Sequence, residues 1–274
     1  MLPWQVKLPG KALHLCPMSF GICSLSIVPC RREPASASEM VTQLLFGETY
    51  EVVEEREDWI SIVTSYDRYP CWISAKQHTA LADQPPEIQQ AGMLSSELIQ
   101  VISNRDTQAV FPLTIGAVLP GFTNHVCHLG EISFLFEGHV TDAAIRKPVK
   151  DLIDTAYLFL NAPYLWGGRS PFGIDCSGFV QLVYKLNGYQ LPRDASQQVE
   201  LGMPLSFVEE AEAGDLAFFD NEQGSIVHVG IVLDNQRIIH ASGSVRVDRF
   251  DHYGIFHSDT KKYSHMLRVI KKII

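Results

Sequence analysis

One cysteine stands where the sequence could make it a nucleophile. Cys176 follows a glycine-rich segment, and apolar residues continue after it at helical spacing until Asn187-Gly188, so the sequence predicts that Cys176 begins a helix. The unpaired N–H groups and the dipole at a helix N-terminus favour a thiolate, and the same N–H groups can stabilise an oxyanion. An isolated cysteine is more often buried and inert, so the prediction depends on partners elsewhere in the chain.

Two histidines further along the chain could serve this thiol. His228 interrupts the apolar residues 226–233, and His240 lies in the apolar residues 237–241. The short polar segment between these runs predicts a tight hairpin, in which the two imidazoles are cross-strand neighbours to within one residue of register. A buried imidazole needs polar partners. A nucleophile, a base and an orienting group are the parts that covalent acyl transfer requires, so we predict Cys176 as nucleophile, His228 as general base and His240 as orienter.

Other polar and aromatic residues near these motifs allow two interpretations. Asp175 precedes the cysteine and is well placed as a helix cap, and Arg193 with Asp194 could form a solvated ion pair. Tyr164 and Trp166 are either core aromatics or the wall of a pocket beside the cysteine. The histidines near the C-terminus show no spacing that suggests a metal site, and we expect them at the surface: His252, His257 and His265.

The hydrophobic pattern divides the chain into a strand-rich first half and a mixed α+β second half. Short apolar runs separated by turns predict two small all-β barrels, with strands that include 23–27 and 111–119. After Pro148 the period changes to that of a helix over 149–160, and a last strand is predicted at 266–270. The predicted domains are a leader at 1–16, a first barrel at 17–80, a second barrel at 81–145 with a linker at 83–87, and a catalytic domain at 146–274.

Composition excludes several classes of function. The chain of 274 residues has a formal net charge of −9 and no cluster of Lys and Arg, which argues against a nucleic-acid partner. With 46% apolar and 19% charged residues and no apolar run of sufficient length, it is typical of a globular protein without a membrane span. Six scattered cysteines without C-x-x-C pairs predict mostly free thiols. Free thiols favour the cytoplasm, and export to the periplasm or the outside stays open.

Taken in order, the motifs of the second half resemble those of the NlpC/P60 family, papain-like cysteine peptidases that cleave bacterial cell-wall peptides. The resemblance runs from about residue 149 to the C-terminus, and it implies a papain-like α+β domain with Cys176 as nucleophile, His228 as general base and His240 as the third, orienting residue. The matching segments are Tyr164-Leu165-Trp166-Gly167-Gly168, Asp175-Cys176-Ser177-Gly178-Phe179, Leu191-Pro192-Arg193, Gly214-Asp215-Leu216, His228-Val229-Gly230-Ile231 and Ile239-His240-Ala241.

The first half resembles the bacterial SH3-like domains that precede this catalytic domain in γ-D-glutamyl-L-diamino-acid peptidases. In that subgroup an acidic residue and a tyrosine of the first SH3-like domain reach the active site, and Glu39 and Tyr69 occupy the matching contexts. The subgroup often has Ser after Arg-Asp, whereas this chain has Ala195 there and Ser196 one place later. By the same resemblance, the residues that bind substrate in the catalytic domain are Tyr164, Trp166, Asp175, Ser177, Arg193 and Asp194.

The resemblance implies a free murein stem peptide as substrate, L-Ala-γ-D-Glu followed by meso-diaminopimelate or Lys. Burying its N-terminal ammonium group requires carboxylates, and Glu39 with Asp175 is the expected pair. The enzyme would release L-Ala-γ-D-Glu through a thioester on Cys176. We expect no cofactor, no metal and a monomer.

Three alternatives stay open at the level of sequence. The SH3-like domains could hold a wall or protein ligand beside a catalytically silent third domain. The papain-like scaffold could instead carry an amidase or an acyltransferase. Finally, Cys176, His228 and His240 could bind a catalytic zinc ion, because thiolate and imidazole suit that metal.

Overall fold

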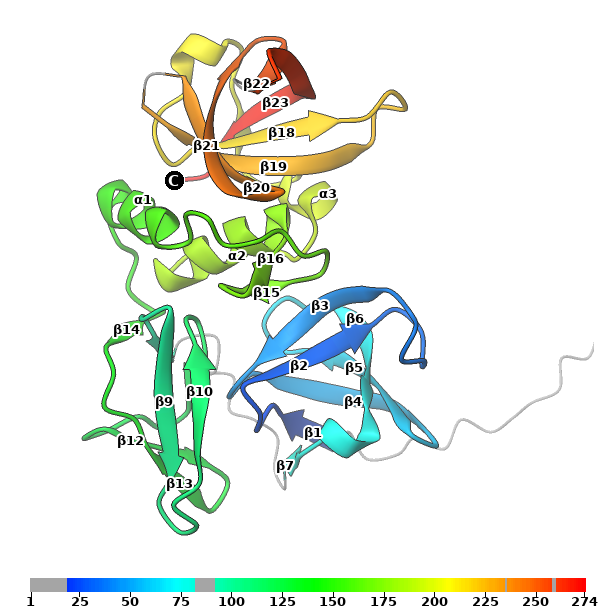
Figure 1. Ribbon diagram of the computed structural model, residues 1–274, viewed down its shortest axis with the longest axis vertical. Coiled ribbons are helices and arrows are strands. Elements are labelled where there is room, and N and C mark those ends of the chain that lie inside the picture. The colour runs from blue at the N-terminus through cyan, green and yellow to red at the C-terminus, as the bar shows by residue number, and fades with distance from the viewer. Residues whose placement is uncertain (1–18, 82–91, 235, 258–259) are drawn as a thin grey trace, which may run out of the picture.

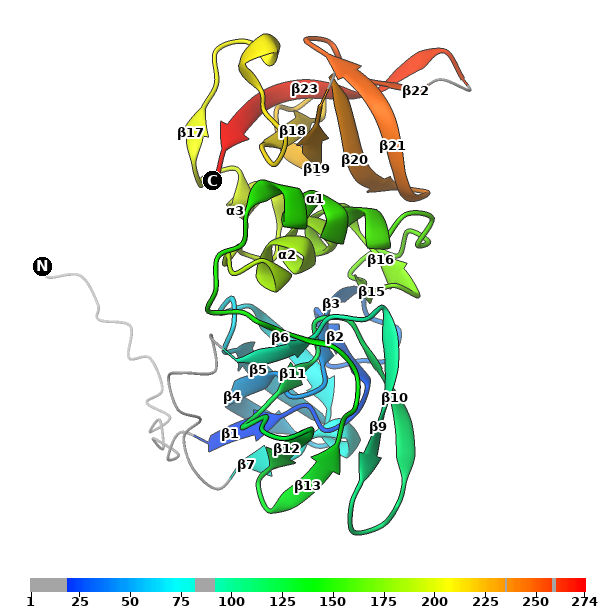
Figure 2. The same ribbon diagram turned by 90° about the vertical axis from the view of Figure 1, so that its left-hand side faces the viewer.

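A computed structural model describes residues 19–81, 92–234, 236–257 and 260–274. Two all-β units lie side by side, and a third unit of helices and strands packs against them (Figures 1 and 2). The leader predicted at 1–16 and the linker predicted at 83–87 lie outside the described residues. None of the helices in the described part of the chain has the length and apolar character needed to cross a membrane.

The first unit is one antiparallel sheet with the strand order β3-β2-β6-β5-β4-β1-β7. Its strands are β1 Ser19–Ile22, β2 Ile27–Arg31, β3 Met40–Leu45, β4 Thr49–Arg56, β5 Trp59–Thr64, β6 Pro70–Ser74 and β7 Ala80–Leu81, with the 3-10 helix η1 Ala75–Gln77 before β7. Side chains along β5 alternate between buried and half-buried, which turns Ile60 and Ile62 into the core. The strand predicted at 23–27 is wrong. The chain bends there, because the Cys23 N–H and thiol donate to the carbonyls of Glu48 and Leu25.

The second unit has two small antiparallel sheets, ordered β10-β9-β13-β12 and β11-β8-β14. The strands are β8 Met93–Ser95, β9 Ile99–Asn104, β10 Val110–Thr114, β11 Val118–Leu119, β12 Val126–Leu129, β13 Ile132–Leu135 and β14 Val140–Asp142. The single strand predicted at 111–119 is wrong, because Gly116 breaks it with a φ of +83°. A Cβ on Gly116 would lie 2.3 Å from the Leu182 Cδ1 of the third unit. The break therefore lets the two units approach closely.

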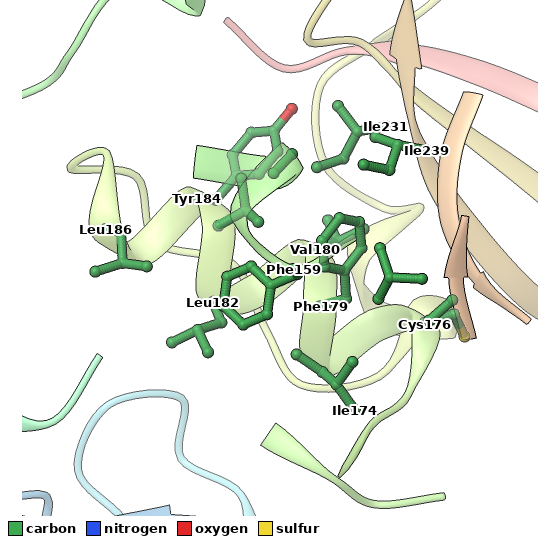
Figure 3. Close-up of a cluster of buried hydrophobic side chains, with 14 of the residues drawn as sticks. Phe159, Ile174, Cys176, Phe179, Val180, Leu182, Tyr184, Leu186, Ile231 and Ile239 are labelled. Atoms are coloured by element: carbon green, nitrogen blue, oxygen red, sulfur yellow. The ribbon is translucent and has the colours of Figure 1, made fainter. Parts of the chain in front are cut away.

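The third unit packs helices against an antiparallel sheet ordered β17-β23-β18-β19-β20-β21-β22. Because β23 also pairs with β22, six of these strands close into a barrel. Helix α2 contacts β19 and β20, and its apolar face fills the main core of the unit (Figure 3). The elements are α1 Val149–Leu158, β15 Arg169–Ser170, β16 Gly173–Ile174, α2 Cys176–Leu186, α3 Ala195–Gln198, β17 Met203–Pro204, η3 Val208–Glu210, β18 Leu216–Asp220, β19 Ile226–Leu233, β20 Arg237–Ser242, β21 Ser244–Asp251, β22 Gly254–His257 and β23 Lys262–Lys272.

Buried charges fix the first unit against the third. The Glu48 carboxylate accepts hydrogen bonds from Arg169 at 2.8 and 3.0 Å and from Lys185 at 2.7 Å, and all three side chains are buried. Burial opposes ionisation, but the two cations hold the pKa of Glu48 at about 2. Removing Glu48 would leave two buried cations without their shared carboxylate. At the same interface, a Cβ on Gly167 would lie 2.3 Å from the Met40 carbonyl oxygen, so the backbones of the two units touch beside α2.

Candidate active site

The N-terminus of α2 carries the predicted nucleophile. Cys176 is the first residue of the helix, and Phe179 and Val180 in the next turn belong to the core (Figure 3). Asp175 caps the helix, because its Oδ1 accepts a hydrogen bond from the Gly178 N–H at 2.7 Å. The Cys176 side chain is only 6% exposed, yet it lines a surface cleft. Its sulfur is therefore fixed by the core and borders a space that a substrate could enter.

Cys176 is a thiol in the resting protein. Burial and the negative charge of Asp175 raise the pKa of Cys176 to about 12, whereas backbone hydrogen bonds from Val229 and Ser177 act to lower it. The sequence favoured a thiolate at this helix end. In the structure, however, burial disfavours the thiolate more than the helix N-terminus stabilises it. The nucleophile therefore needs a base that accepts its proton during attack. Val229 directly follows His228, so the strand that contacts the sulfur also carries the predicted base.

His228, His240 and Asp248 form a chain of hydrogen bonds across β19, β20 and β21. The Nε2 of His228 lies 2.8 Å from the Nδ1 of His240, and the Nε2 of His240 lies 3.1 Å from an Asp248 oxygen. Burial lowers the pKa of both histidines, that of His228 well below its usual range. Burial opposes ionisation of Asp248, but hydrogen bonds from His240 and Arg246 hold the pKa of its carboxyl at about 2. Near neutral pH both imidazoles are therefore neutral, and Asp248 is a carboxylate.

This hydrogen-bond chain dictates where each proton lies. A carboxylate can only accept, so His240 must donate its Nε2–H to Asp248. A neutral His240 then has an unprotonated Nδ1, which can only accept the Nε2–H of His228. The remaining nitrogen of His228, Nδ1, is left with a lone pair. These hydrogen bonds thus leave His228 able to act as a base, and Asp248 is the residue that fixes the tautomers of both histidines.

The two imidazoles are diagonal neighbours in the sheet. Ile231 pairs with Ile239, which places Gly230, and not His228, opposite His240. The offset is two residues, so the prediction of a register within one residue is wrong. Gly230 makes the diagonal contact feasible, because a Cβ at that position would lie 2.8 Å from the His240 Cβ. A bare backbone there lets the His240 ring reach His228.

His265 covers one face of the His228 ring. The two rings stack with their centroids 4.1 Å apart and an interplanar angle of 24°. Phe219, on the strand between β19 and β23, contacts both rings. Burial and the neighbouring His240 lower the pKa of His265 to about 4. The expectation that His265 is a surface histidine is therefore wrong, because barrel closure brings β23 over the catalytic strand.

Replacing Asp248 with asparagine is expected to lower kcat about 10- to 100-fold with little change in KM, because an amide no longer dictates which His240 nitrogen carries the proton. Steady-state kinetics would measure both constants. Asp251→Asn is the matched control, since Asp251 lies on the same strand but accepts from Tyr253 and Tyr263 and, within the described part of the chain, has no hydrogen bond to either catalytic histidine. An Asp248→Asn enzyme with wild-type kcat would contradict the tautomer assignment.

A cleft of about 250 Å³ lies between the first and third units beside Cys176. Glu39 of the first unit accepts a hydrogen bond from the Trp166 indole at 2.7 Å, and the Tyr69 hydroxyl donates to Asp194 at 3.2 Å. Each of these pairs joins one unit to the other across the cleft. The predicted substrate-binding residues that line it are Glu39, Tyr69, Trp166, Asp175, Ser177 and Asp194.

Neither of the other two predicted binding residues, Arg193 and Tyr164, lines this cleft, and Arg193 lies behind its wall. Arg193 is 1% exposed and donates to Asp175 at 2.6 and 3.0 Å and to Ser177 at 3.0 Å. Asp175 also accepts from two backbone N–H groups, so both of its oxygens are occupied. Tyr164 is half-buried, and burial, with the nearby Cys176 and Asp175, raises the pKa of its hydroxyl to about 12. Arg193 and Asp175 thus support the wall rather than present free charge.

The geometry does not favour the zinc alternative. Both nitrogens of His240 are engaged, one with His228 and the other with Asp248, which leaves no lone pair for a metal. Within residues 19–81, 92–234, 236–257 and 260–274, no three His, Cys, Asp or Glu side chains form a group that could hold a metal ion.

Sequence reasoning missed Asp248, His265 and Arg32. Asp248 and His265 lie on strands with ordinary alternation, and only strand pairing brings them to His228 and His240. Arg32 belongs to the loop after β2 and lines the cleft. The one local signal was composition, since acidic and imidazole side chains are uncommon on buried strands.

The fold and the site define a thiol-dependent hydrolase domain preceded by an SH3-like domain, and comparison with known proteins agrees with this domain order. Residues 161–264 match the NlpC/P60 family, and residues 30–77 match the bacterial dipeptidyl-peptidase SH3 domain. The γ-D-glutamyl-L-lysine dipeptidyl-peptidase of Bacillus subtilis is 32% identical over 216 residues, which cover 73% of this chain and 71% of that protein. The Bacillus cereus protein of the same name is 27% identical over 233 residues, covering 77% and 70%.

A solved structure shares the fold. The crystal structure of an NlpC/P60 family protein from Bacillus cereus ATCC 10987 superposes with a TM-score of 0.78 at 21% identity, covering 93% of this chain and 99% of that chain. The chain belongs to the NlpC/P60 family, and it is a cysteine-type peptidase with an SH3-like domain before the catalytic domain. The predicted family and fold class are confirmed, and the catalytically silent alternative is not retained.

Proposed function

We propose that the protein hydrolyses the γ-D-glutamyl-L-diamino acid bond of murein stem peptides that have a free N-terminal L-Ala, releasing L-Ala-γ-D-Glu. The observation that carries the proposal is the cleft, in which carboxylates of both units stand near Cys176. The relatives named γ-D-glutamyl-L-lysine dipeptidyl-peptidase support the same reaction. A dipeptidyl-peptidase must cleave two residues from a free amine, and carboxylates in the cleft beside the nucleophile suit recognition of that amine.

The proposed reaction follows from the tautomers of His228 and His240. As the Cys176 sulfur attacks the γ-amide carbonyl, His228 Nδ1 takes the thiol proton, and N–H groups at the start of α2 stabilise the oxyanion. His228 then gives that proton to the leaving amine, and a thioester remains on Cys176. Water attacks the thioester while His228 accepts its proton. The proton returns to the Cys176 sulfur as the dipeptide leaves.

Recognition of the substrate amine is assigned to Glu39 and Asp194. The expected pair was Glu39 and Asp175, but both oxygens of Asp175 already accept from Arg193 and from backbone N–H groups. Asp194 instead accepts one hydrogen bond from Tyr69 and lines the cleft, and burial raises the pKa of its carboxyl. An ammonium group beside Asp194 would relieve that burial penalty by pairing with its carboxylate.

Acetylating the N-terminus of L-Ala-γ-D-Glu-L-Lys is expected to lower wild-type kcat/KM about 100-fold or more, because the acetyl group removes the cation that the cleft carboxylates would pair with. Glu39→Gln should lose about as much on the free peptide, since glutamine can still accept from the Trp166 indole but carries no charge. Mass spectrometry of the released L-Lys measures both rates.

Glu51→Gln is the control for this test, because Glu51 lies in the same unit and pairs with Arg68, and neither residue lines the cleft. It should keep wild-type kcat/KM. Cleavage of the acetylated peptide as fast as the free peptide would refute amine recognition.

Digestion of intact sacculi beside free peptides tests the predicted cytoplasmic recycling role, for which the enzyme should cleave free peptides in preference to sacculi.

A further inference from the structure

Arg32 is the one cationic side chain among the described residues that line the cleft. Its Nε lies 2.5 Å from the Glu39 Oε2, and Trp166 holds the other Glu39 oxygen at 2.7 Å. The nearby Arg193 cannot take its place, because Arg193 is 1% exposed and its guanidinium is bound to Asp175, Ser177 and Thr42. The Arg32 side chain is 59% exposed. Apart from Asp175, which Arg193 binds, the carboxylates of the cleft are those of Glu39 and Asp194, and its one guanidinium, that of Arg32, pairs with Glu39.

The proposed substrate carries one charge of each sign. A D-glutamyl residue linked through its γ-carboxyl keeps its α-carboxylate free, so L-Ala-γ-D-Glu presents an ammonium and a carboxylate. Five covalent bonds separate the ammonium nitrogen from the carboxylate carbon, which limits their separation to about 6 Å. The carboxylate must therefore lie close to the groups that hold the amine. Beside Glu39 and Asp194 alone it would be repelled, and the cleft residue after Asp194 is Ala195, which has no hydrogen-bond donor on its side chain.

We propose that Arg32 binds the free α-carboxylate of the D-glutamyl residue and thereby makes the enzyme selective for D-glutamate over its α-carboxamide, D-isoglutamine. This inference rests on the proposed function. In the ligand-free protein the Arg32 guanidinium neutralises Glu39. When the dipeptide binds, its ammonium group pairs with Glu39 and Asp194. The Arg32 guanidinium then pairs with the dipeptide carboxylate instead of Glu39. One ion pair is exchanged for two, and each charge of the dipeptide gains a partner of opposite sign.

The test compares two peptides, L-Ala-γ-D-Glu-L-Lys and the same peptide with a D-isoglutamine α-carboxamide, on wild type and Arg32→Gln. Wild type is expected to prefer the carboxylate peptide by about tenfold or more in kcat/KM, which is the discrimination of one charged hydrogen bond. Arg32→Gln should lose about tenfold on the carboxylate peptide only. Its rate on the carboxamide peptide should be unchanged or higher, because Glu39 no longer has a competing partner. Arg32→Lys should restore part of the preference.

Arg56→Gln is the matched control. Arg56 lies in the same unit, is 56% exposed and pairs with Glu54 at 2.5 Å, but it does not line the cleft beside Cys176. It should leave both rates unchanged. Equal losses on the two peptides in Arg32→Gln, or no loss on either, would overturn the role of Arg32 while leaving the proposed function intact. If wild type cleaves neither peptide, the proposed function and this inference fall together.

Discussion

Cys176→Ala is expected to abolish turnover of L-Ala-γ-D-Glu-L-Lys, with a loss of about ten-thousand-fold or more in kcat, because no thioester can form without the sulfur. The fold should persist. Alanine keeps the Cβ at the first position of α2, and the Asp175 cap on the Gly178 N–H does not involve the thiol. Release of L-Lys measures turnover, and circular dichroism with thermal melting measures the fold. Iodoacetamide should inactivate wild type and label Cys176.

Cys127→Ala is the control for this substitution. Cys127 is also buried but lies on β12 in the core of the second unit, and Figure 1 shows β12 far from α2. The variant should keep wild-type kcat. Its free energy of unfolding should decrease, because a large-to-small change in a core leaves a cavity. Undiminished turnover in Cys176→Ala would remove the assigned nucleophile and with it the proposed mechanism.

His228→Gln is expected to lower kcat about a thousand- to ten-thousand-fold, because an amide can keep the hydrogen bond to His240 but cannot accept the thiol proton at neutral pH. The effect should be large because the Cys176 thiol, with a pKa of about 12, does not ionise without a base. Steady-state kinetics at neutral pH measure the loss. His252→Gln, at an exposed position on the turn after β21, should have wild-type kcat. A loss of less than tenfold would exclude His228 as the base.

The pH profile of the wild type provides a second readout of His228. Burial and the neighbouring His240 and His265 lower its pKa below the ordinary value of 6.5. Since only the neutral ring is a base, kcat/KM should stay high as the pH falls through 6.5 and drop only at lower pH. The folded protein takes up these protons at lower pH than the unfolded chain does. Stability should therefore decrease as the pH falls below about 6.5, so thermal melting must accompany the kinetics.

The parts of the site that depend on local sequence were predictable. The helix over 149–158 and the helix that begins at Cys176 follow from apolar spacing and from their stop signals. The hairpin of β19 and β20 follows from two apolar runs around a polar turn. These features depend on interactions between residues close in the chain, which hydrophobic periodicity records directly.

Other parts required pairings that no local pattern encodes. The register that sets His240 diagonal to His228 depends on Gly230, whose missing side chain matters only once the strands pair. The break at Gly116 and the bend at Cys23 replaced predicted strands, because contacts with distant residues outweighed local β-propensity. The ion pairs by which Glu48 joins the first unit to the third were not predictable, since its partners Arg169 and Lys185 lie in another unit.

The sequence by itself determined the family, the nucleophile and the helix that presents it, because motif order and apolar spacing are properties of the chain. Only the tertiary structure decided the protonation states of the catalytic residues and which residues form the wall of the cleft. Burial makes Cys176 a thiol rather than a thiolate, and Asp248 fixes the tautomer of His228 through His240. Docking of the first unit brings Glu39 and Arg32 to the cleft. Desolvation and ion pairing act through space, so these properties exist only once the chain has folded.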